Sequence, residues 1–186
     1  MKTQDSITKL VKNNSLQYAG YLAVAKTRAK VLKAVSYVIP IRRPMLFVGE
    51  TACNELCDML INEDNTNVFI VTDTVLNKLG IPAKVTDYLD AKNISYHIYD
   101  GITPDPTFKV VEEGLRQSIE ANCDSIVAIG GGSVIDAAKM IAMSQGNKCK
   151  PKQLIGILKA RKPATPLYCV PTTAGTGSEA TLGAVV

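Results

Sequence analysis

The chain has 186 residues, of which 46% are hydrophobic and 20% charged, with 13 glycines and 9 prolines. This length suits one ordinary domain with a sizeable core, and the composition excludes collagen-like, low-complexity and fully disordered proteins. No apolar run approaches the roughly 20 residues of a membrane span. We therefore expect a soluble folded protein with no membrane partner.

The charge is unevenly distributed, although the formal net charge is only +4. Positions 1–43 hold nine Lys and Arg residues against one acid, Asp5, and positions 148–162 hold six basic residues and no acid. Basic segments of this kind can bind nucleic acid, but no zinc-finger, RRM or basic-zipper pattern accompanies them. We interpret them as solvated surface and expect no nucleic-acid partner.

The first predicted element is a helix over residues 16–37, where small and apolar residues recur at helical spacing. An Ala-Val-Ala sequence at 23–25 resembles a signal-peptide cleavage site, but the apolar run before it is weak and the helical spacing continues past it. Residues 1–39 are therefore predicted to form a basic helical segment packed on a domain that spans residues 40–186.

After Pro40, strand and helix patterns alternate. The predicted strands are apolar runs at 45–48, 67–72, 94–99, 125–129 and 167–170, and the predicted helices cover 51–62, 82–92, 107–122 and 134–145. Continuous apolar runs are typical of strands that are covered on both faces. The pattern predicts an α/β fold, a doubly wound parallel sheet of the Rossmann-like type, with ligands bound beyond the carboxyl ends of the strands.

Five cysteines, an odd number scattered along a chain that needs no disulfides to fold, favour free thiols and a cytoplasmic protein. Cys53 and Cys57 would share one face of a helix, but His97 is the only histidine, so burial in the core is favoured over metal binding. His97 lies in a β-branched and aromatic run, which favours a structural role over a catalytic one.

The most informative segment is the glycine loop, Gly130, Gly131 and Gly132, which joins a predicted strand to a predicted helix. Glycines permit positive φ and close approach of a ligand, and the free amides of a helix start attract an anion such as phosphate. The alternative is a tight turn in which Ser133 is the N-cap and Asp136 completes a capping box. The loop matches neither a Walker motif nor the usual dinucleotide fingerprint.

Two further strand ends carry polar side chains. The last predicted strand runs into a hydroxyl loop, residues 171–181, which contains Thr172, Thr173, Thr176 and Ser178 and whose hydroxyls could donate to phosphate and ribose oxygens or simply form a turn that caps a helix. Asp73 follows another strand, where its carboxylate could accept ribose hydroxyls or cap the next helix.

Together these motifs resemble the iron-containing alcohol dehydrogenase family. The resemblance rests on Gly130–Ser133 with Asp136 and Lys139, and on the Pro-Thr-Thr-Ala-Gly-Thr-Gly-Ser-Glu sequence at 171–179. It covers residues 40–186, the family's N-terminal dinucleotide-binding domain. Two features differ: Asp105 stands where members often have Asn, and the sequence stops before the helical domain that supplies an Asp and three His to the metal.

The resemblance implies a parent enzyme that oxidises a primary alcohol or reduces an aldehyde by hydride transfer with a nicotinamide cofactor. It implies Fe²⁺ or another divalent metal in the full-length parent only, and a homo-oligomer, expected to be a homodimer. We expect NAD in preference to NADP, because the Asp73 carboxylate would accept the ribose hydroxyls of NAD and repel the additional phosphate of NADP. No catalytic residue or metal ligand is assigned in this chain, which we expect to be inactive by itself as a single domain without the helical metal-binding domain. The implied cofactor contacts are Asp73, Asp105, Gly131, Gly132, Ser133, Asp136, Lys139, Lys162, Thr172, Thr173, Thr176 and Ser178.

Within this list, Gly131, Gly132 and Ser133 are expected at the pyrophosphate, and Lys162 near the nicotinamide. Lys139 has two interpretations: it could neutralise phosphate or pair with Asp136 along its helix. Two rival functions stay open. One is an enzyme related to glycerol dehydrogenase or dehydroquinate synthase, against which the 171–179 sequence argues, and the other is a non-enzymatic nucleotide-binding module.

Overall fold

The computed structural model describes residues 23, 26–27, 45–156, 159–181 and 183–185, and the chain divides into two compact units, Met1–Met45 and Leu46–Val186. Of the helix predicted over 16–37, only Ala23, Lys26 and Thr27 are described, and all three are helical. The rest of that helix and the basic segment 1–39 lie outside the described residues. The second unit contains every described strand.

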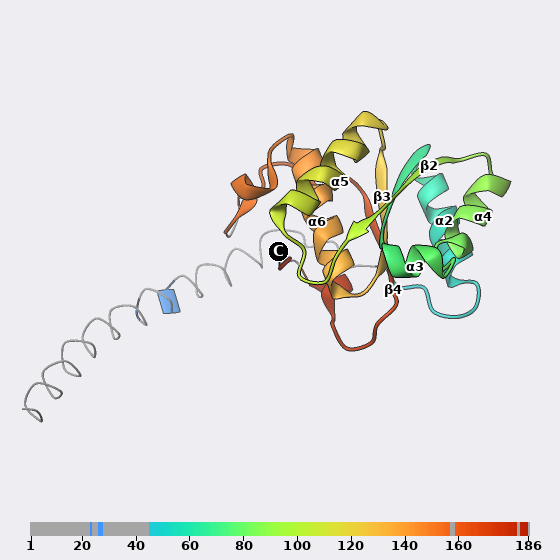
Figure 1. The fold of residues 1–186 in the computed structure, drawn as a ribbon, viewed down its shortest axis with the longest axis horizontal. Coiled ribbons are helices and arrows are strands. Elements are labelled where there is room, and N and C mark those ends of the chain that lie inside the picture. Colours follow the sequence, from blue (N-terminus) through green and yellow to red (C-terminus); the bar gives the residue numbers. More distant parts are fainter. Residues whose placement is uncertain (1–22, 24–25, 28–44, 157–158, 182, 186) are drawn as a thin grey trace, which may run out of the picture. The chain divides into compact units, whose positions relative to one another are not determined.

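The second unit is built on a sheet of parallel strands (Figure 1). The strands are β1 (Asn67–Asp73), β2 (Ser95–Ile102), β3 (Ser125–Gly130) and β4 (Leu167–Pro171), in the spatial order β2-β1-β3-β4. The register aligns Phe69 with His97 on β2 and with Ile126 on β3. The predicted doubly wound, Rossmann-like parallel sheet is therefore confirmed.

Helices connect the strands and cover both faces of the sheet. They are α2 (Ala52–Asn62), α3 (Thr74–Lys78), α4 (Ala83–Ala91), α5 (Phe108–Glu120) and α6 (Gly132–Asn147), with 3₁₀ turns η1 (Pro151–Leu154) and η2 (Ser178–Ala180). The four longer helices match the predicted ranges closely, whereas α3, only five residues long, was not predicted.

The strand predicted at 45–48 is wrong. Residues 45–48 have no strand conformation, and Leu46 and Val48 are 80% and 82% exposed. An apolar run becomes a strand only when a neighbouring strand pairs with it, and no described strand pairs with this one.

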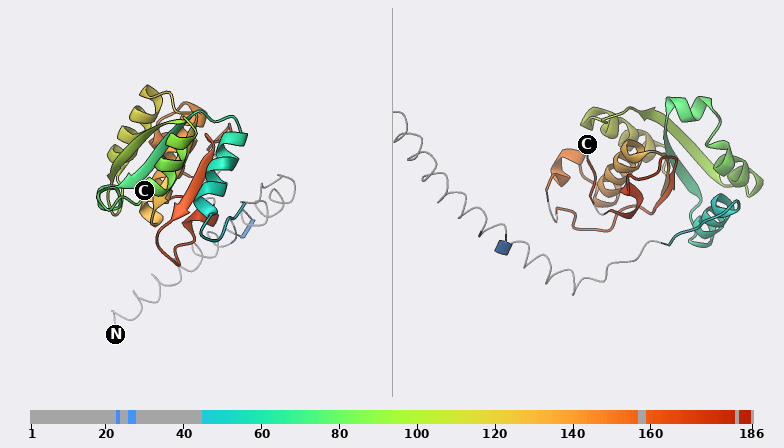
Figure 2. Two further views of the ribbon diagram at one scale, coloured as in Figure 1. Left: turned by 90° about the vertical axis from the view of Figure 1, so that its right-hand side faces the viewer. Right: turned by 90° about the horizontal axis from the view of Figure 1, so that it is seen from below.

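Alternate residues of each central strand enter two separate hydrophobic clusters. Phe69 and Val71 of β1 pack with side chains of α5 and α6, whereas Val68 and Ile70 pack with side chains of α2 and α4. Figures 1 and 2 show these two helix pairs on opposite sides of the sheet. Because both faces are covered, each strand is a continuous apolar run, as the sequence indicated.

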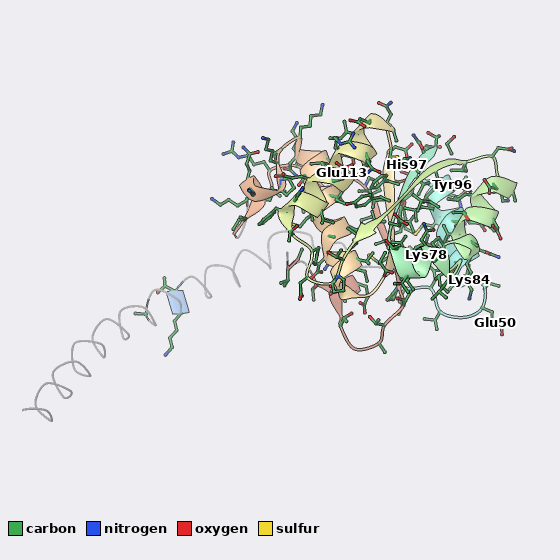
Figure 3. The ribbon with its side chains drawn as sticks, in the orientation of Figure 1. Glu50, Lys78, Lys84, Tyr96, His97 and Glu113 are labelled. Atoms are coloured by element: carbon green, nitrogen blue, oxygen red, sulfur yellow. The ribbon has the colours of Figure 1, made fainter. Side chains whose placement is uncertain are left out.

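The cysteines and the histidine have structural surroundings. All five cysteines are free thiols. Of the two expected in the core, Cys57 is buried, whereas Cys53 is only partly buried against the same hydrophobic cluster. His97 stacks on Phe69 with ring centroids 5.8 Å apart, and its Nε2 lies 3.2 Å from Oε1 of Gln117. Gln117 in turn donates to Glu113 of α5, so His97 belongs to a surface hydrogen-bond chain between β2 and α5 (Figure 3).

Polar side chains close the edge of the sheet at which the strands begin. Asp124 accepts hydrogen bonds from the amides of Thr66 (2.7 Å) and Asn67 (3.2 Å), just before and at the start of β1. At the end of α6, Oδ1 of Asn147 accepts from the amides of Arg161 and Lys162, both at 2.8 Å. Each side chain satisfies backbone groups of a segment distant in sequence.

None of the described helices is both long and apolar enough to cross a membrane.

Candidate nucleotide site at the carboxyl edge of the sheet

The strand order reverses its direction between β1 and β3. From β1 the chain passes to β2 on one side, and β3 then pairs with β1 on the other side. In open α/β sheets, ligands bind at such a reversal of strand order, outside the carboxyl ends of the strands. Oγ1 of the buried Thr72 donates to the carbonyl of Ile129 at 2.9 Å and holds these two strand ends together.

The glycine loop forms the transition from β3 to α6. Gly131 is the N-cap of α6, with φ −80° and ψ −172° and no side-chain cap, and Ser133 lies inside the first turn. The capping box with Ser133 as N-cap is therefore wrong. Positive φ, which glycine permits, is not used at any of the three positions.

Close packing explains why these positions are glycine. A Cβ on Gly131 would lie 3.2 Å from Oγ1 of Thr173, and one on Gly132 would lie 3.2 Å from Oγ of Ser178 and 3.4 Å from Cβ of Thr176. The hydroxyl loop thus lies directly against the glycine loop, although about 40 residues separate them in sequence. Both predicted motifs form one surface at this edge, toward which the view from below in Figure 2 looks.

Unpaired amides lie at the start of α6, beside this surface. The first α6 amide with a hydrogen bond is that of Ile135, which donates to the Gly131 carbonyl at 3.1 Å. Within the described residues, the amides of Gly132, Ser133 and Val134 have no acceptor. The start of this 16-residue helix also carries the positive end of its dipole, so the local chemistry favours an anion.

Asp73 lies at the carboxyl end of β1, the strand that pairs with β3. Its Oδ1 accepts hydrogen bonds from the amides of Val75 and Leu76, both at 2.9 Å, and so caps α3. The capping interpretation is correct. Oδ2 has no hydrogen-bond partner within the described residues, so the same carboxylate retains an acceptor for a ligand hydroxyl.

Lys139 pairs with Asp136, as one of its two interpretations predicted. Its Nζ lies 3.2 Å from Oδ1 of Asp136, 2.9 Å from Oγ1 of Thr181 and 2.8 Å from the carbonyl of Gly183. Oδ2 of Asp136 accepts from the amide of Val185 at 3.0 Å. Thr181 and Gly183 were not candidates, because in sequence nothing distinguishes them from other residues of a loop.

The two remaining candidates differ in position. Asp105 is exposed, with φ 52°, in the loop that follows β2, so it belongs to the carboxyl edge. Lys162 is bound through its backbone to Asn147, at the far end of α6 from Gly132. A helix of that length spans about 24 Å. The structure therefore does not bring Lys162 to the other candidates.

A family model described as iron-containing alcohol dehydrogenase matches residues 44–186. The chain belongs to the iron-containing alcohol dehydrogenase family.

Similar proteins are known in sequence and in structure. The chain is 39% identical over 140 residues to lactaldehyde reductase of Escherichia coli, covering 74% of this chain and 37% of that protein. It is 37% identical over 160 residues to alcohol dehydrogenase 4 of Schizosaccharomyces pombe, covering 86% and 37%. A crystal structure of 1,3-propanediol oxidoreductase superposes with a TM-score of 0.71 at 33% identity, covering 75% and 36%.

The chain thus spans little more than a third of the length of these relatives. Family membership implies a nicotinamide cofactor, NAD or NADP, and a metal ion. Three features fit a dinucleotide. The free amides of α6 suit its phosphates, the glycine positions leave room that a side chain would fill, and the uncommitted Oδ2 of Asp73 can accept a ribose hydroxyl. In the described part of the chain, no three His, Cys, Asp or Glu residues come together as metal ligands, so these residues do not fit the metal.

Proposed function

We propose that this chain is the dinucleotide-binding part of an NAD-dependent alcohol dehydrogenase. One observation carries the proposal: the glycine loop and the hydroxyl loop meet at the unpaired amides that open α6. That combination offers backbone donors, side-chain hydroxyls and a helix dipole to one anionic group, as a pyrophosphate requires.

The residues have distinct roles in this proposal. The amides at Gly131, Gly132 and Ser133 bind the pyrophosphate, and the hydroxyls of Thr172 and Thr173 donate to the adenosine and ribose side. Asp73 accepts the ribose hydroxyls of the adenosine through Oδ2 and disfavours the additional phosphate of NADP, because like charges repel.

Three more candidates line or approach the same edge. Thr176 and Ser178 contact the position of a side chain on Gly132 and would complete the hydroxyl wall around the phosphates. Asp105, in the loop after β2, is proposed to lie toward the nicotinamide side.

In the whole enzyme, a primary alcohol would lose a hydride to the nicotinamide ring and a proton from its hydroxyl group, giving the aldehyde. Bound metal, held by residues outside the described part of this chain, would polarise the alcohol oxygen and make its proton easier to remove. The names of the relatives, which include reductases and dehydrogenases of small alcohols and aldehydes, support this substrate class. We also propose a cytoplasmic homodimer; the five free thiols support the compartment.

The test is a calorimetric titration of NAD into wild type and Gly132→Val. The valine side chain would enter the space between the glycine loop and Ser178, so NAD affinity should fall at least about a hundredfold, about 2.7 kcal/mol, while the circular dichroism spectrum stays unchanged. Ala91→Val, which adds the same side chain at an exposed site on α4, is the matched control and should bind as wild type does. No NAD binding by wild type, or full affinity in Gly132→Val, would refute the proposal.

A further inference from the structure

The ammonium group of Lys139 has used all its hydrogen-bond donors. A lysine has three N–H groups and no acceptor. Three acceptors surround Nζ at 2.8–3.2 Å: Asp136, Thr181 and the carbonyl of Gly183. No donor is left for a phosphate oxygen while these bonds persist.

The pair is also shielded from water. The side chains of Lys139 and Asp136 are only 14% and 12% exposed, and each neutralises the other's charge. Removing one member would leave a buried charge without its partner, which is costly in a low-dielectric environment. Such a pair is suited to holding a segment in place.

The segment that it holds is the end of the hydroxyl loop. This loop is exposed and contains two glycines at positive φ, Gly175 (90°) and Gly177 (63°). Its backbone therefore has few internal restraints, and contacts with other segments must hold it in place. At its start, the amide of Thr172 donates to the carbonyl of Gly130 at 3.0 Å. At its other end, Lys139 donates to Thr181 and Gly183, and Asp136 accepts from the amide of Val185, so this end is fastened to α6.

A chain of bonds leads from this pair to the candidate site. Lys139 donates to Oγ1 of Thr181, which donates to the carbonyl of Ser178 at 3.2 Å. The side chain of Ser178 lies against the Gly132 position. The placement of that hydroxyl therefore depends on the pair.

We infer that Asp136 and Lys139 are positioning residues: they clamp Thr181, Gly183 and Val185 to α6 and so hold the hydroxyl loop against the glycine loop. Lys139 is not itself a phosphate ligand. This inference deepens the proposed function and rests on it for its effect on NAD. The clamp replaces the sequence-based expectation that both residues contact the cofactor.

Neutralising Asp136 distinguishes a phosphate ligand from a clamp, because the two roles of Lys139 predict opposite changes in NAD affinity. If Lys139 bound the pyrophosphate, Asp136→Asn would remove a nearby negative charge and tighten NAD binding. If the pair is a clamp, Asp136→Asn loosens the loop, and NAD affinity falls at least about tenfold. Lys139→Met should lose a similar factor, whereas Lys148→Met, an exposed lysine at the other end of α6, should stay within about twofold of wild type.

Loop mobility gives a readout that does not depend on NAD. The chain has no tryptophan, so Ala174→Trp places a single fluorophore at the exposed tip of the hydroxyl loop. Time-resolved anisotropy of this reporter, without nucleotide, should show larger local motion after Lys139→Met, Asp136→Asn or Thr181→Val, and no change after Lys148→Met. Thr181→Val keeps both charges and removes the Thr181 hydroxyl, with its bonds to Lys139 and Ser178. It therefore covers the case in which a charge variant fails to fold.

The outcomes are separable. If wild type binds no NAD, the proposed function fails, and the reporter alone decides the clamp. Tighter or unchanged NAD binding in Asp136→Asn, or unchanged anisotropy in Lys139→Met and Thr181→Val, overturns the clamp whatever the fate of the proposed function.

Discussion

The edge at which the strands begin and the edge at which they end differ in how many of their backbone amides have hydrogen-bond partners. Where the strands begin, Asp124 and Asn147 satisfy amides of distant segments with their side chains. Where the strands end, the amides of Gly132, Ser133 and Val134 have no acceptor among the described residues. Both edges are built from the same strands, so the difference lies in the loops.

This difference teaches how one fold divides stability from binding. Buried backbone groups without partners cost free energy, so an edge that serves only the fold acquires side chains that satisfy them. An edge that leaves donors free and surrounds them with hydroxyls retains that capacity for a ligand. Changes at the first edge should reduce stability, and changes at the second should reduce nucleotide affinity.

The largest expected effect is at the closed edge, in Gly146→Ala. A methyl group on Gly146 would overlap the carbonyl oxygen of Pro163 and come within 2.9 Å of the Ala164 carbonyl carbon. Because this neighbour is backbone and cannot rotate away, the free energy of unfolding should fall by about 3 kcal/mol. Urea unfolding measures it. Gly183→Ala, where the methyl group would meet nothing within 4 Å, is the control; equal losses in the two variants would contradict the packing argument.

Asp124→Ala should come next, with a loss of about 2 kcal/mol, because it removes the charged acceptor of the amides before and at the start of β1. NAD affinity per folded molecule should not change. Asp124→Asn keeps one acceptor oxygen and should lose less stability. A large loss of NAD affinity in Asp124→Ala, measured where the protein is fully folded, would break the division between the two edges.

At the open edge, Asp73→Asn and Asp73→Gly should alter cofactor choice more than stability. Loss of the carboxylate weakens its bond to the ribose hydroxyls, so NAD affinity should fall roughly tenfold, about 1.4 kcal/mol, and NADP affinity should rise. Glycine at an N-cap costs only a few tenths of a kcal/mol compared with aspartate, so α3 should persist. Titrations of both cofactors at constant salt measure the ratio; an unchanged ratio would leave Asp73 as a helix cap alone.

The smallest expected effect is a loss of stability at alkaline pH, which is absent at neutral pH and comes from the buried thiol of Cys57 in the core between the two edges. Burial, followed by the neighbouring Cys53 and Asp58, raises the pKa of Cys57 from 9.0 to about 11. Because the pKa is higher in the folded state, the contribution of the protonated Cys57 thiol to the free energy of unfolding is complete below pH 9. That contribution is lost as the pH rises toward 11. Unfolding free energies at pH 8, 9, 10 and 11 should therefore decline more steeply in wild type than in Cys57→Ala. Parallel declines would show that this thiol is not responsible.

Local pattern was enough to predict much of this protein. The apolar runs at 67–72 and 125–129 indicated buried parallel strands, and the glycines and hydroxyls after the strands marked the edge where a ligand would bind. These inferences succeed because a strand's burial and the residues at its end are encoded within a few neighbouring positions. The cap formed by Asp73 on α3 is equally local, since its acceptor and donors lie within three residues.

Only the tertiary structure decided what distant residues do to one another. The strand order, which reverses between β1 and β3, depends on pairings that no local pattern contains. None of the glycines of the 130–132 loop has positive φ; instead Val134, Thr173 and Ser178 pack tightly against the places where their side chains would lie. The run at 45–48 pairs with no described strand. Lys139 was ambiguous in sequence because its partners at 181 and 183 become neighbours only when the hydroxyl loop folds back onto α6.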